Sequence, residues 1–194
     1  IAFFMLTGEL MTSATITDRL VALSRALIGR IRGGLAQVNV LVSMFFAGMN
    51  GSVVADTATV GALVLPAMKK AGYPAAFSAA VTGVSSTIGG IIPPSIMMIV
   101  LANATEISIA SLFAAGIVPG ILIGVVIMVI NHYFAVKYNF ERSDEPFSVR
   151  RAGKELYRSS FALLIPLVLV GSVMGGVASV VEAGAITALV ALFT

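Results

Sequence analysis

The chain has 194 residues, of which 58% are hydrophobic and only 11% are charged, and its formal net charge is +3. So few charged side chains cannot cover the surface of a water-soluble globule of this size, so the composition indicates a protein surrounded by lipid. The absence of cysteine excludes disulfide bonds and cysteine metal sites, and the single histidine, His132, excludes a histidine-cluster metal site.

Both ends of the chain look cut. Residues 1–11 contain an apolar run without a basic segment before it, which we interpret as the end of a truncated transmembrane helix. Residues 183–194 form another apolar run, too short for a hydrocarbon core that needs about 20 helical residues. We therefore expect an internal piece of a longer protein.

Residues 12–35 have the pattern of an amphipathic helix. Apolar side chains recur at helical spacing on one face and charged side chains lie opposite, namely Ile16, Leu20, Leu23, Leu27 and Ile31 against Asp18, Arg25 and Arg32. This pattern predicts an arm helix in the membrane interface, with its arginines toward the lipid headgroups.

The basic residues fall into three clusters along the chain. They are Arg19, Arg25, Arg30 and Arg32; then Lys69 and Lys70; then Lys137, Arg142, Arg150, Arg151, Lys154 and Arg158. Because basic loops remain in the cytoplasm, we expect all three clusters on that face, with an even number of crossings between them.

The predicted hairpin segment is 36–74. Its residues 36–68, which lie between the first two clusters, are too few for two full spans and are interrupted at Asn50-Gly51-Ser52. A re-entrant hairpin with its tip near the bilayer centre keeps both clusters on one face. Backbone at that depth is tolerated only against protein or a wet cavity. The alternative is a single kinked span, which would place Lys69 and Lys70 on the opposite face.

The rest of the chain is predicted to cross the membrane three times. Residues 75–107 form a transmembrane helix that glycines and prolines break between Thr87 and Ser95. The predicted elements after it are an unbroken transmembrane helix over 108–136, a cytoplasmic basic loop over 137–158, and a transmembrane helix with the start of a truncated segment over 159–194. Within the second helix, Gly116, Gly120 and Gly124 allow close helix packing.

The two interrupted helices are the strongest functional signal, because broken apolar segments mark the binding sites of transporters. The half-helix that ends at each break presents carbonyl groups, which suit Na⁺, and the half-helix that starts presents N–H groups, which suit a carboxylate. Hydroxyl and amide side chains cluster at both breaks: Asn50, Ser52, Ser85, Ser86, Thr87 and Ser95. Each alone has a structural explanation as a helix cap or a bond back to a carbonyl, but six together favour a site.

Asp56 lies four residues after Ser52, inside the membrane by this topology. An ionisable residue at such a depth is by default a functional hypothesis, here cation or substrate coupling. The alternative is that its charge merely complements the dipole of the first turn of a half-helix. The sequence leaves both explanations open.

Two sets of site residues follow from these patterns. The predicted cation-binding set is Asn50, Gly51, Ser52, Asp56, Ser85, Ser86, Thr87, Gly89 and Gly90, and the predicted substrate-binding set is Ser52, Pro93, Pro94 and Ser95. No phosphate loop, zinc-protease motif or nucleophile elbow occurs. We therefore predict no catalytic residue, and no cofactor other than Na⁺ as a coupling ion.

Five stretches carry a resemblance to a known family. They are GGLAQVNV (33–40), FAGMNGS (46–52) with Ala55-Asp56, PAM (66–68) with GYP (72–74), SSTIGGIIPPS (85–95) and AGIVPG (115–120). The chain resembles, along essentially its whole length, the DctM-like large membrane subunit of tripartite ATP-independent periplasmic (TRAP) transporters. The departures are Asn50, where the family usually has Ser or Thr, and Gly90, where it often has Pro.

The resemblance implies an elevator-type, Na⁺-driven symporter of the bacterial inner membrane, with two inverted repeats of which this chain holds the first hairpin and broken helix. It implies a carboxylate substrate, often a dicarboxylate or sugar acid, delivered by a soluble periplasmic binding protein. A small four-helix membrane subunit is the implied partner within the bilayer, and nucleic acid is not expected as a partner.

The leading functional hypothesis is a Na⁺/carboxylate symporter whose hairpin domain moves against a scaffold. The alternative is a channel or pore subunit, which also uses re-entrant half-helices but conducts without dependence on a substrate. An intramembrane enzyme is disfavoured, because the sequence offers no paired nucleophile and base.

Overall fold

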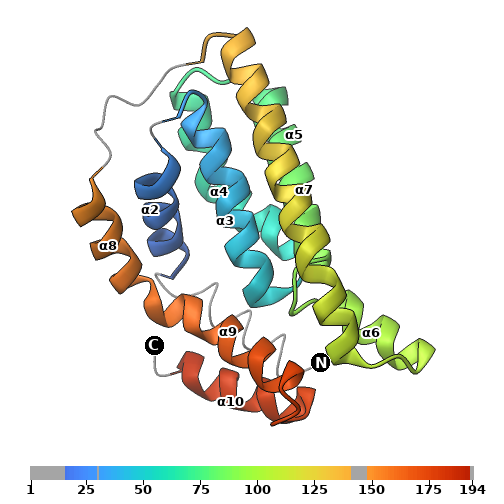
Figure 1. Ribbon diagram of the computed structural model, residues 1–194. Coiled ribbons are helices and arrows are strands. Elements are labelled where there is room, and N and C mark those ends of the chain that lie inside the picture. The colour runs from blue at the N-terminus through green and yellow to red at the C-terminus, as the bar shows by residue number, and fades with distance from the viewer. Residues whose placement is uncertain (1–15, 30, 141–147, 193–194) are drawn as a thin grey trace.

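A computed structural model describes residues 16–29, 31–140 and 148–192 (Figure 1). No strand occurs among these residues, so the predicted all-α fold class is confirmed. The elements in chain order are α2 (Ile16–Ile28), α3 (Gly34–Asn50), α4 (Val53–Lys70), α5 (Ala75–Ser86), a 3-10 turn η1 (Thr87–Gly90), α6 (Ile96–Thr105), α7 (Ile109–Lys137), α8 (Val149–Arg158), α9 (Ser160–Met174) and α10 (Val180–Leu192). The predicted truncated helix 1–11 lies outside the described residues.

Helices α3 and α4 form a hairpin whose two outer ends lie at the same end of the molecule. Gly33, just before α3, packs against Ala135 near the end of α7, where a Cβ on the glycine would lie 2.5 Å from the alanine Cβ. Tyr73, just after α4, contacts the ring of Phe140, which follows α7, with 4.6 Å between ring centroids. The chain therefore enters and leaves the hairpin on the side where α7 ends.

Gly51 and Ser52 make the tip of this hairpin. Gly51 has a left-handed backbone with φ of 56°, which glycine adopts without strain, and its N–H donates to the Ala47 carbonyl at 3.2 Å, which ends α3. The Ser52 hydroxyl then accepts a hydrogen bond from the Ala55 N–H at 3.4 Å and begins α4. The Asn-Gly-Ser sequence thus specifies the reversal locally.

Helices α5 and α6 are the two halves of the broken helix. The chain leaves α5 at Ser86, makes the 3-10 turn η1, and becomes α-helical again only at Ile96. The pair Pro93-Pro94 has no backbone N–H with which to continue a helix. Ser95 caps the second half, because its hydroxyl accepts a hydrogen bond from the Met98 N–H at 3.4 Å.

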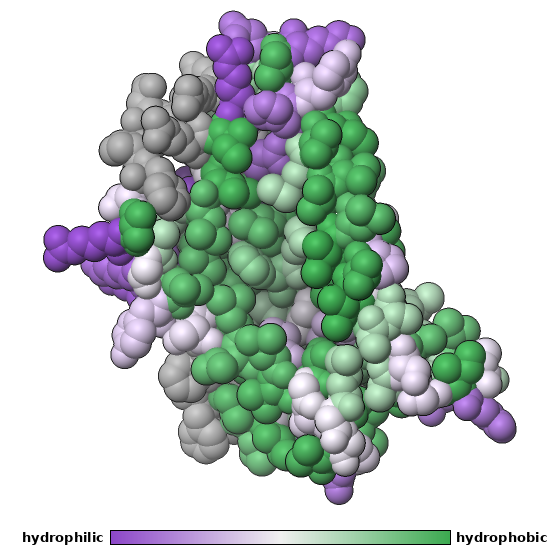
Figure 2. Space-filling view, viewed as in Figure 1, coloured by the Kyte–Doolittle hydropathy of each residue, from purple (hydrophilic) through white to green (hydrophobic). Residues whose placement is uncertain are grey.

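Helix α7 has 29 residues and is about 43 Å long. Within the described part of the chain, it is the one helix long and apolar enough to cross a bilayer by itself. Helices α8 and α9, bent by 62° where they meet, form a second span if they are counted together. Exposed apolar side chains cover the outer face of α7, as contact with lipid requires (Figure 2): Val118, Leu122, Val125 and Val129.

Three glycines line the inner face of α7: Gly116, Gly120 and Gly124. A Cβ on Gly116 would overlap the carbonyl oxygen of Ile91, and a Cβ on Gly120 would overlap the side chain of Ile92. The backbone of α7 therefore packs directly against the break in the broken helix, at Ile91 and Ile92.

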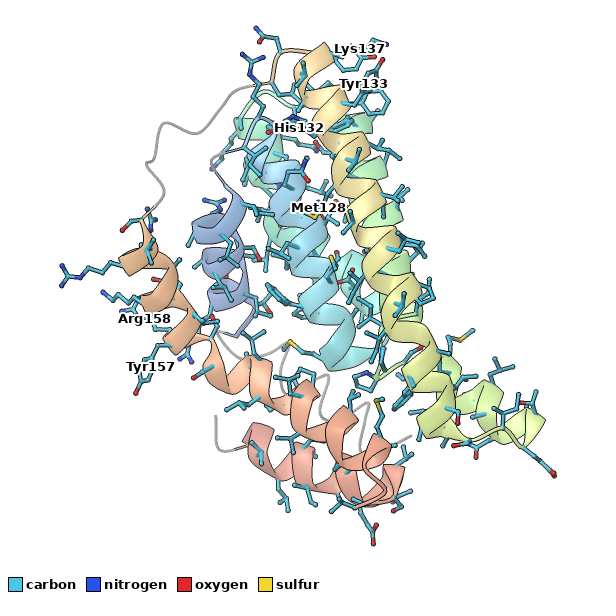
Figure 3. The ribbon with its side chains drawn as sticks, viewed as in Figure 1. Met128, His132, Tyr133, Lys137, Tyr157 and Arg158 are labelled. Carbon is cyan, nitrogen blue, oxygen red and sulfur yellow. The ribbon has the colours of Figure 1, made fainter. Side chains whose placement is uncertain are left out.

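Polar and aromatic side chains gather where the hairpin opens. His132, Tyr133 and Lys137 lie in the last turns of α7 (Figure 3), and the Lys137 ammonium lies 5.7 Å from the centroid of the Tyr138 ring. The hydrophilic surface at this end contrasts with the apolar sides of the molecule (Figure 2). This distribution is typical of an end that faces the membrane–water interface.

Helices α2 and α8 lie beside each other at the edge of the hairpin (Figure 1). The Ser159 hydroxyl donates to the Arg19 carbonyl at 3.3 Å, and the Arg19 guanidinium donates to the Arg158 carbonyl at 3.4 Å. Helix α8 forms the last ten residues of the predicted basic loop 137–158. The hydroxyl of Ser148 caps this helix, a signal that the basic composition concealed.

The segment 159–194, predicted as a transmembrane helix with the start of a truncated segment, begins with a shorter helix in the structure. Helix α9 ends at Met174 after 15 residues, about 22 Å, which is less than the roughly 30 Å of a hydrocarbon core. Gly176, with φ of 67°, reverses the chain, and α10 packs back along α9.

The close contact at the hairpin tip predicts different effects for two glycine substitutions. Gly51 and Gly72 both have positive φ, 56° and 80°, so Gly51→Ala and Gly72→Ala carry similar backbone strain of about 1 kcal/mol. A Cβ at position 51 would overlap the Pro94 carbonyl oxygen, whereas a Cβ at position 72 meets nothing within 4 Å. In the full-length protein in detergent, Gly51→Ala should lower the thermal unfolding temperature several degrees more than Gly72→Ala. Equal shifts would contradict the contact.

Candidate functional site

The hairpin tip lies against the break of the broken helix. The Ile96 N–H donates to the Gly51 carbonyl at 3.3 Å, which joins the start of α6 to the tip. On the other side of the tip, a Cβ on Gly89 would lie 3.7 Å from the carbonyl of Ser52, and one on Gly90 would lie 3.4 Å from Val53. The two interruptions, separate in the sequence, therefore form one junction.

Two helix N-termini meet at this junction, those of α4 and α6. Each is capped by a serine, Ser52 or Ser95, whose hydroxyl accepts from the N–H three residues later at 3.4 Å. Aligned peptide dipoles make such termini electropositive and suited to an anion. Ser95 is fully buried and its hydroxyl also donates to the Gly90 carbonyl at 2.9 Å. Of the predicted substrate-binding residues, Pro93 and Pro94 are also buried, and Ser52 alone is partly exposed.

Asp56 lies one turn into α4 and its side chain is fully buried. Neither carboxylate oxygen has a hydrogen-bond partner within the described residues. Removing a carboxylate from water costs several kcal/mol, whereas a favourable helix dipole contributes at most about 2 kcal/mol. The dipole therefore does not offset the burial, and the arrangement is suited to a positive charge or a proton at this carboxyl group.

Two hydroxyl groups stand beside the Asp56 carboxyl group, those of Ser86 on α5 and Ser43 on α3. Neither meets the geometry of a hydrogen bond to it, and each lies within hydrogen-bond distance of another group. The Ser86 hydroxyl donates to the Thr82 carbonyl at 2.8 Å, and the Ser43 hydroxyl lies 3.2 Å from the hydroxyl of Ser85. We call the Asp56 carboxyl group and these two neighbouring hydroxyl groups the Asp56 pocket.

This pocket has the chemistry of a monovalent cation site. It combines one carboxylate with neutral hydroxyl oxygens, and such oxygens suit Na⁺. In the described part of the chain, no three acidic or histidine side chains come together, so there is no ligand set of the kind that a divalent ion prefers. The four side-chain oxygens belong to Asp56, Ser43 and Ser86, from three helices.

The structure separates the predicted cation-binding residues into groups. Ser86 lies at the Asp56 pocket and Ser85 lies behind it, and the glycines of the break pack against the start of α4. Thr87 is exposed and its hydroxyl donates to the Val84 carbonyl at 2.7 Å, away from the pocket. The side chain of Asn50 lies outside the described residues.

Sequence reasoning missed Ser43 and its neighbour Asn39. Both are fully buried on α3, four residues apart, and face the hydroxyl groups of Thr82 and Ser85 on α5. The available signal was polar residues at helical spacing in two otherwise apolar helices, which places them on one face of each.

The comparisons with known proteins agree with these features. The profile of the family "Tripartite ATP-independent periplasmic transporter, DctM component" matches residues 1–194. The sialic acid TRAP transporter large permease protein SiaM of Vibrio cholerae is 35% identical over 193 residues, which cover 100% of this chain and 45% of that protein. The C4-dicarboxylate TRAP transporter large permease protein DctM of Pseudomonas aeruginosa is 37% identical with the same coverage.

A third relative, the 2,3-diketo-L-gulonate TRAP transporter large permease protein YiaN of Escherichia coli, is also 37% identical, over 100% of this chain and 45% of its own length. The chain thus spans about half the length of the curated relatives it matches. These relatives are permease components of transporters and not enzymes. Together with the helical hairpin, the broken helix and the lipid-facing α7, the match over the whole chain shows that it belongs to the DctM family of TRAP transporter large permease components.

Proposed function

We propose that the full-length protein is the membrane subunit of a Na⁺-driven symporter that imports a carboxylate across the bacterial inner membrane. The observation that supports this proposal is the fully buried Asp56 carboxyl group, which lacks a hydrogen-bond partner and adjoins the hydroxyl groups of Ser43 and Ser86. A periplasmic binding protein would deliver the substrate, and a small four-helix membrane subunit would pack beside this one.

In the proposed site, cation binding would affect substrate binding through the first turn of α4. A cation at Asp56 would hold α3, α4 and α5 together and fix the first turn of α4, whose N-terminus begins one turn earlier at Ser52. That N-terminus and the start of α6 would bind the anionic group of the substrate. Because such coupling is reciprocal, bound substrate would raise the affinity for the cation by the same factor.

The substrate class follows from shared chemistry and not from one relative. The three relatives are named for sialic acid, C4-dicarboxylates and 2,3-diketo-L-gulonate, which are all organic acids. Two electropositive helix N-termini at one junction suit a carboxylate whatever the rest of the molecule is. The remaining specificity would depend on parts of the protein beyond this chain.

Replacing Asp56 tests the coupling directly. Asp56→Asn keeps the shape of the side chain and removes its charge, so uptake by the full-length transporter in proteoliposomes should fall at least tenfold and lose its dependence on a Na⁺ gradient. The probes are sialic acid, a C4-dicarboxylate and 2,3-diketo-L-gulonate, each with a periplasmic binding protein. Glu106→Gln, at an exposed acid that ends α6, is the control and should retain Na⁺-driven uptake. Unchanged Na⁺ dependence in Asp56→Asn would reject the cation site at Asp56, and ion flux that needs no substrate would reject the symporter.

Two substitutions that each remove a hydroxyl group distinguish the proposed cation ligands from nearby residues that do not bind the cation. Ser43→Ala removes a hydroxyl beside Asp56, worth about 1 kcal/mol, and should raise the Na⁺ concentration for half-maximal uptake roughly fivefold. Thr87→Val removes an exposed hydroxyl bonded to its own helix and should leave that concentration unchanged. The reverse order of effects would place the cation at the break itself.

A further inference from the structure

Asn39 is a buried amide that the proposed transport mechanism does not yet use. Its side chain lies on α3, one turn before Ser43, and bridges to α5. The amide nitrogen donates to the Thr82 hydroxyl at 2.7 Å, and the amide oxygen accepts from the Ser85 hydroxyl at 3.2 Å. Polar groups buried this deeply in apolar helices are retained for packing or for function.

The hydrogen bonds around Asn39 fix which way its amide points. The Thr82 hydroxyl donates its single proton to the Ser78 carbonyl at 3.0 Å, so it can only accept from Asn39. The amide nitrogen must therefore face Thr82, and the amide oxygen must face Ser85.

The same proton count continues along the chain of hydroxyl groups. The Ser85 proton has three acceptors in reach: the Asn39 amide oxygen at 3.2 Å, the Thr82 carbonyl at 3.1 Å and the Ser43 hydroxyl oxygen at 3.2 Å. The Thr82 carbonyl already accepts from the Ser86 hydroxyl, and it also accepts the N–H of its own helix. These two donors occupy both of its lone pairs. The buried Asn39 amide oxygen receives its hydrogen bond from Ser85, and a buried acceptor left without a donor is costly, so the Ser85 proton goes to Asn39 and not to Ser43. In the 3.2 Å contact between Ser43 and Ser85 the donor is then Ser43.

The direction of the Ser43–Ser85 hydrogen bond decides whether the Ser43 hydroxyl presents a lone pair or a proton to the Asp56 carboxyl group. With its proton directed to Ser85, the Ser43 hydroxyl turns lone pairs toward the carboxyl group, as a cation ligand must. If the chain were broken, Ser43 would rotate and donate to the carboxylate, a strong charge-assisted bond that competes with an ion. We propose that Asn39 is a positioning residue, which holds the Ser43 hydroxyl in its cation-accepting orientation; this inference rests on the proposed cation site at Asp56.

The test is a double-mutant cycle in the full-length transporter, reconstituted in proteoliposomes and assayed for Na⁺-dependent uptake at saturating substrate. Asn39→Ala should raise the half-maximal Na⁺ concentration roughly fivefold, while the maximal rate at saturating Na⁺ stays within about twofold. In the Ser43→Ala background, Asn39→Ala should cause no further shift, because the residue acts through Ser43. Asn131→Ala is the matched control: its buried amide donates to the Ala36 carbonyl at 3.5 Å, so the substitution should lower stability without changing the Na⁺ dependence.

Three outcomes overturn the inference. Asn39→Ala could lower only the maximal rate or the unfolding temperature, as Asn131→Ala should; its effect could add in full to that of Ser43→Ala; or it could leave Na⁺ dependence unchanged. If Asn39→Ala does not reach the membrane, Ser85→Ala breaks the same chain one link closer to Ser43 and must give the same shift. Failure of the underlying proposal is distinguishable, since Asp56→Asn would then retain Na⁺-driven uptake.

Discussion

The buried carboxyl group of Asp56 is the constraint on which the rest of the hairpin depends. Its side chain extends from α4 toward α3 and α5, without solvent contact and without a hydrogen-bond partner among the described residues. A lone charge in such a place is not stable, because desolvation outweighs what the helix dipole returns. The neighbouring helices contribute only oxygen atoms, so the proposed cation, or a proton, would supply the balancing positive charge. Folding of this region and cation binding would therefore be linked, since a ligand that binds only the folded state stabilises it.

The contact between the hairpin tip and the broken helix places the Asp56 carboxyl group close to the helix N-termini that we propose bind the substrate. The Gly51 carbonyl accepts the first N–H of α6, and the start of α4 lies against the glycines of the break. The Asp56 pocket is thus one helical turn from the N-terminus of α4, which lies beside the N-terminus of α6. Helix α7 supports the break from behind through its glycine face, so the junction has backbone against backbone on both sides. Such packing transmits a small displacement instead of absorbing it.

Features fixed by local residues were predictable from the sequence, and features fixed by packing were not. Asn50-Gly51-Ser52 and the Gly-Gly and Pro-Pro pairs mark breaks in any context, so the hairpin and the broken helix were expected where they occur. The chain reversal after Met174 was not predicted, because the segment 159–194 is apolar on both sides of it. Thr87 was grouped with Ser85 and Ser86 by adjacency, although a helix turns about 100° per residue and directs it outward. Ser43 was missed because only the packing of α3 on α4 brings it to Asp56.

The occupancy of the Asp56 pocket tests the central claim most directly. Two high-resolution cryo-electron microscopy maps of the full-length transporter, one in Na⁺ and one with choline in its place, would be compared at this position. The account predicts a density peak in Na⁺ bounded by the Asp56 carboxylate and the hydroxyl oxygens of Ser43 and Ser86, and its loss in choline. Identical maps, with the Ser43 hydroxyl oxygen at hydrogen-bond distance from the carboxylate and no peak in either, would contradict it.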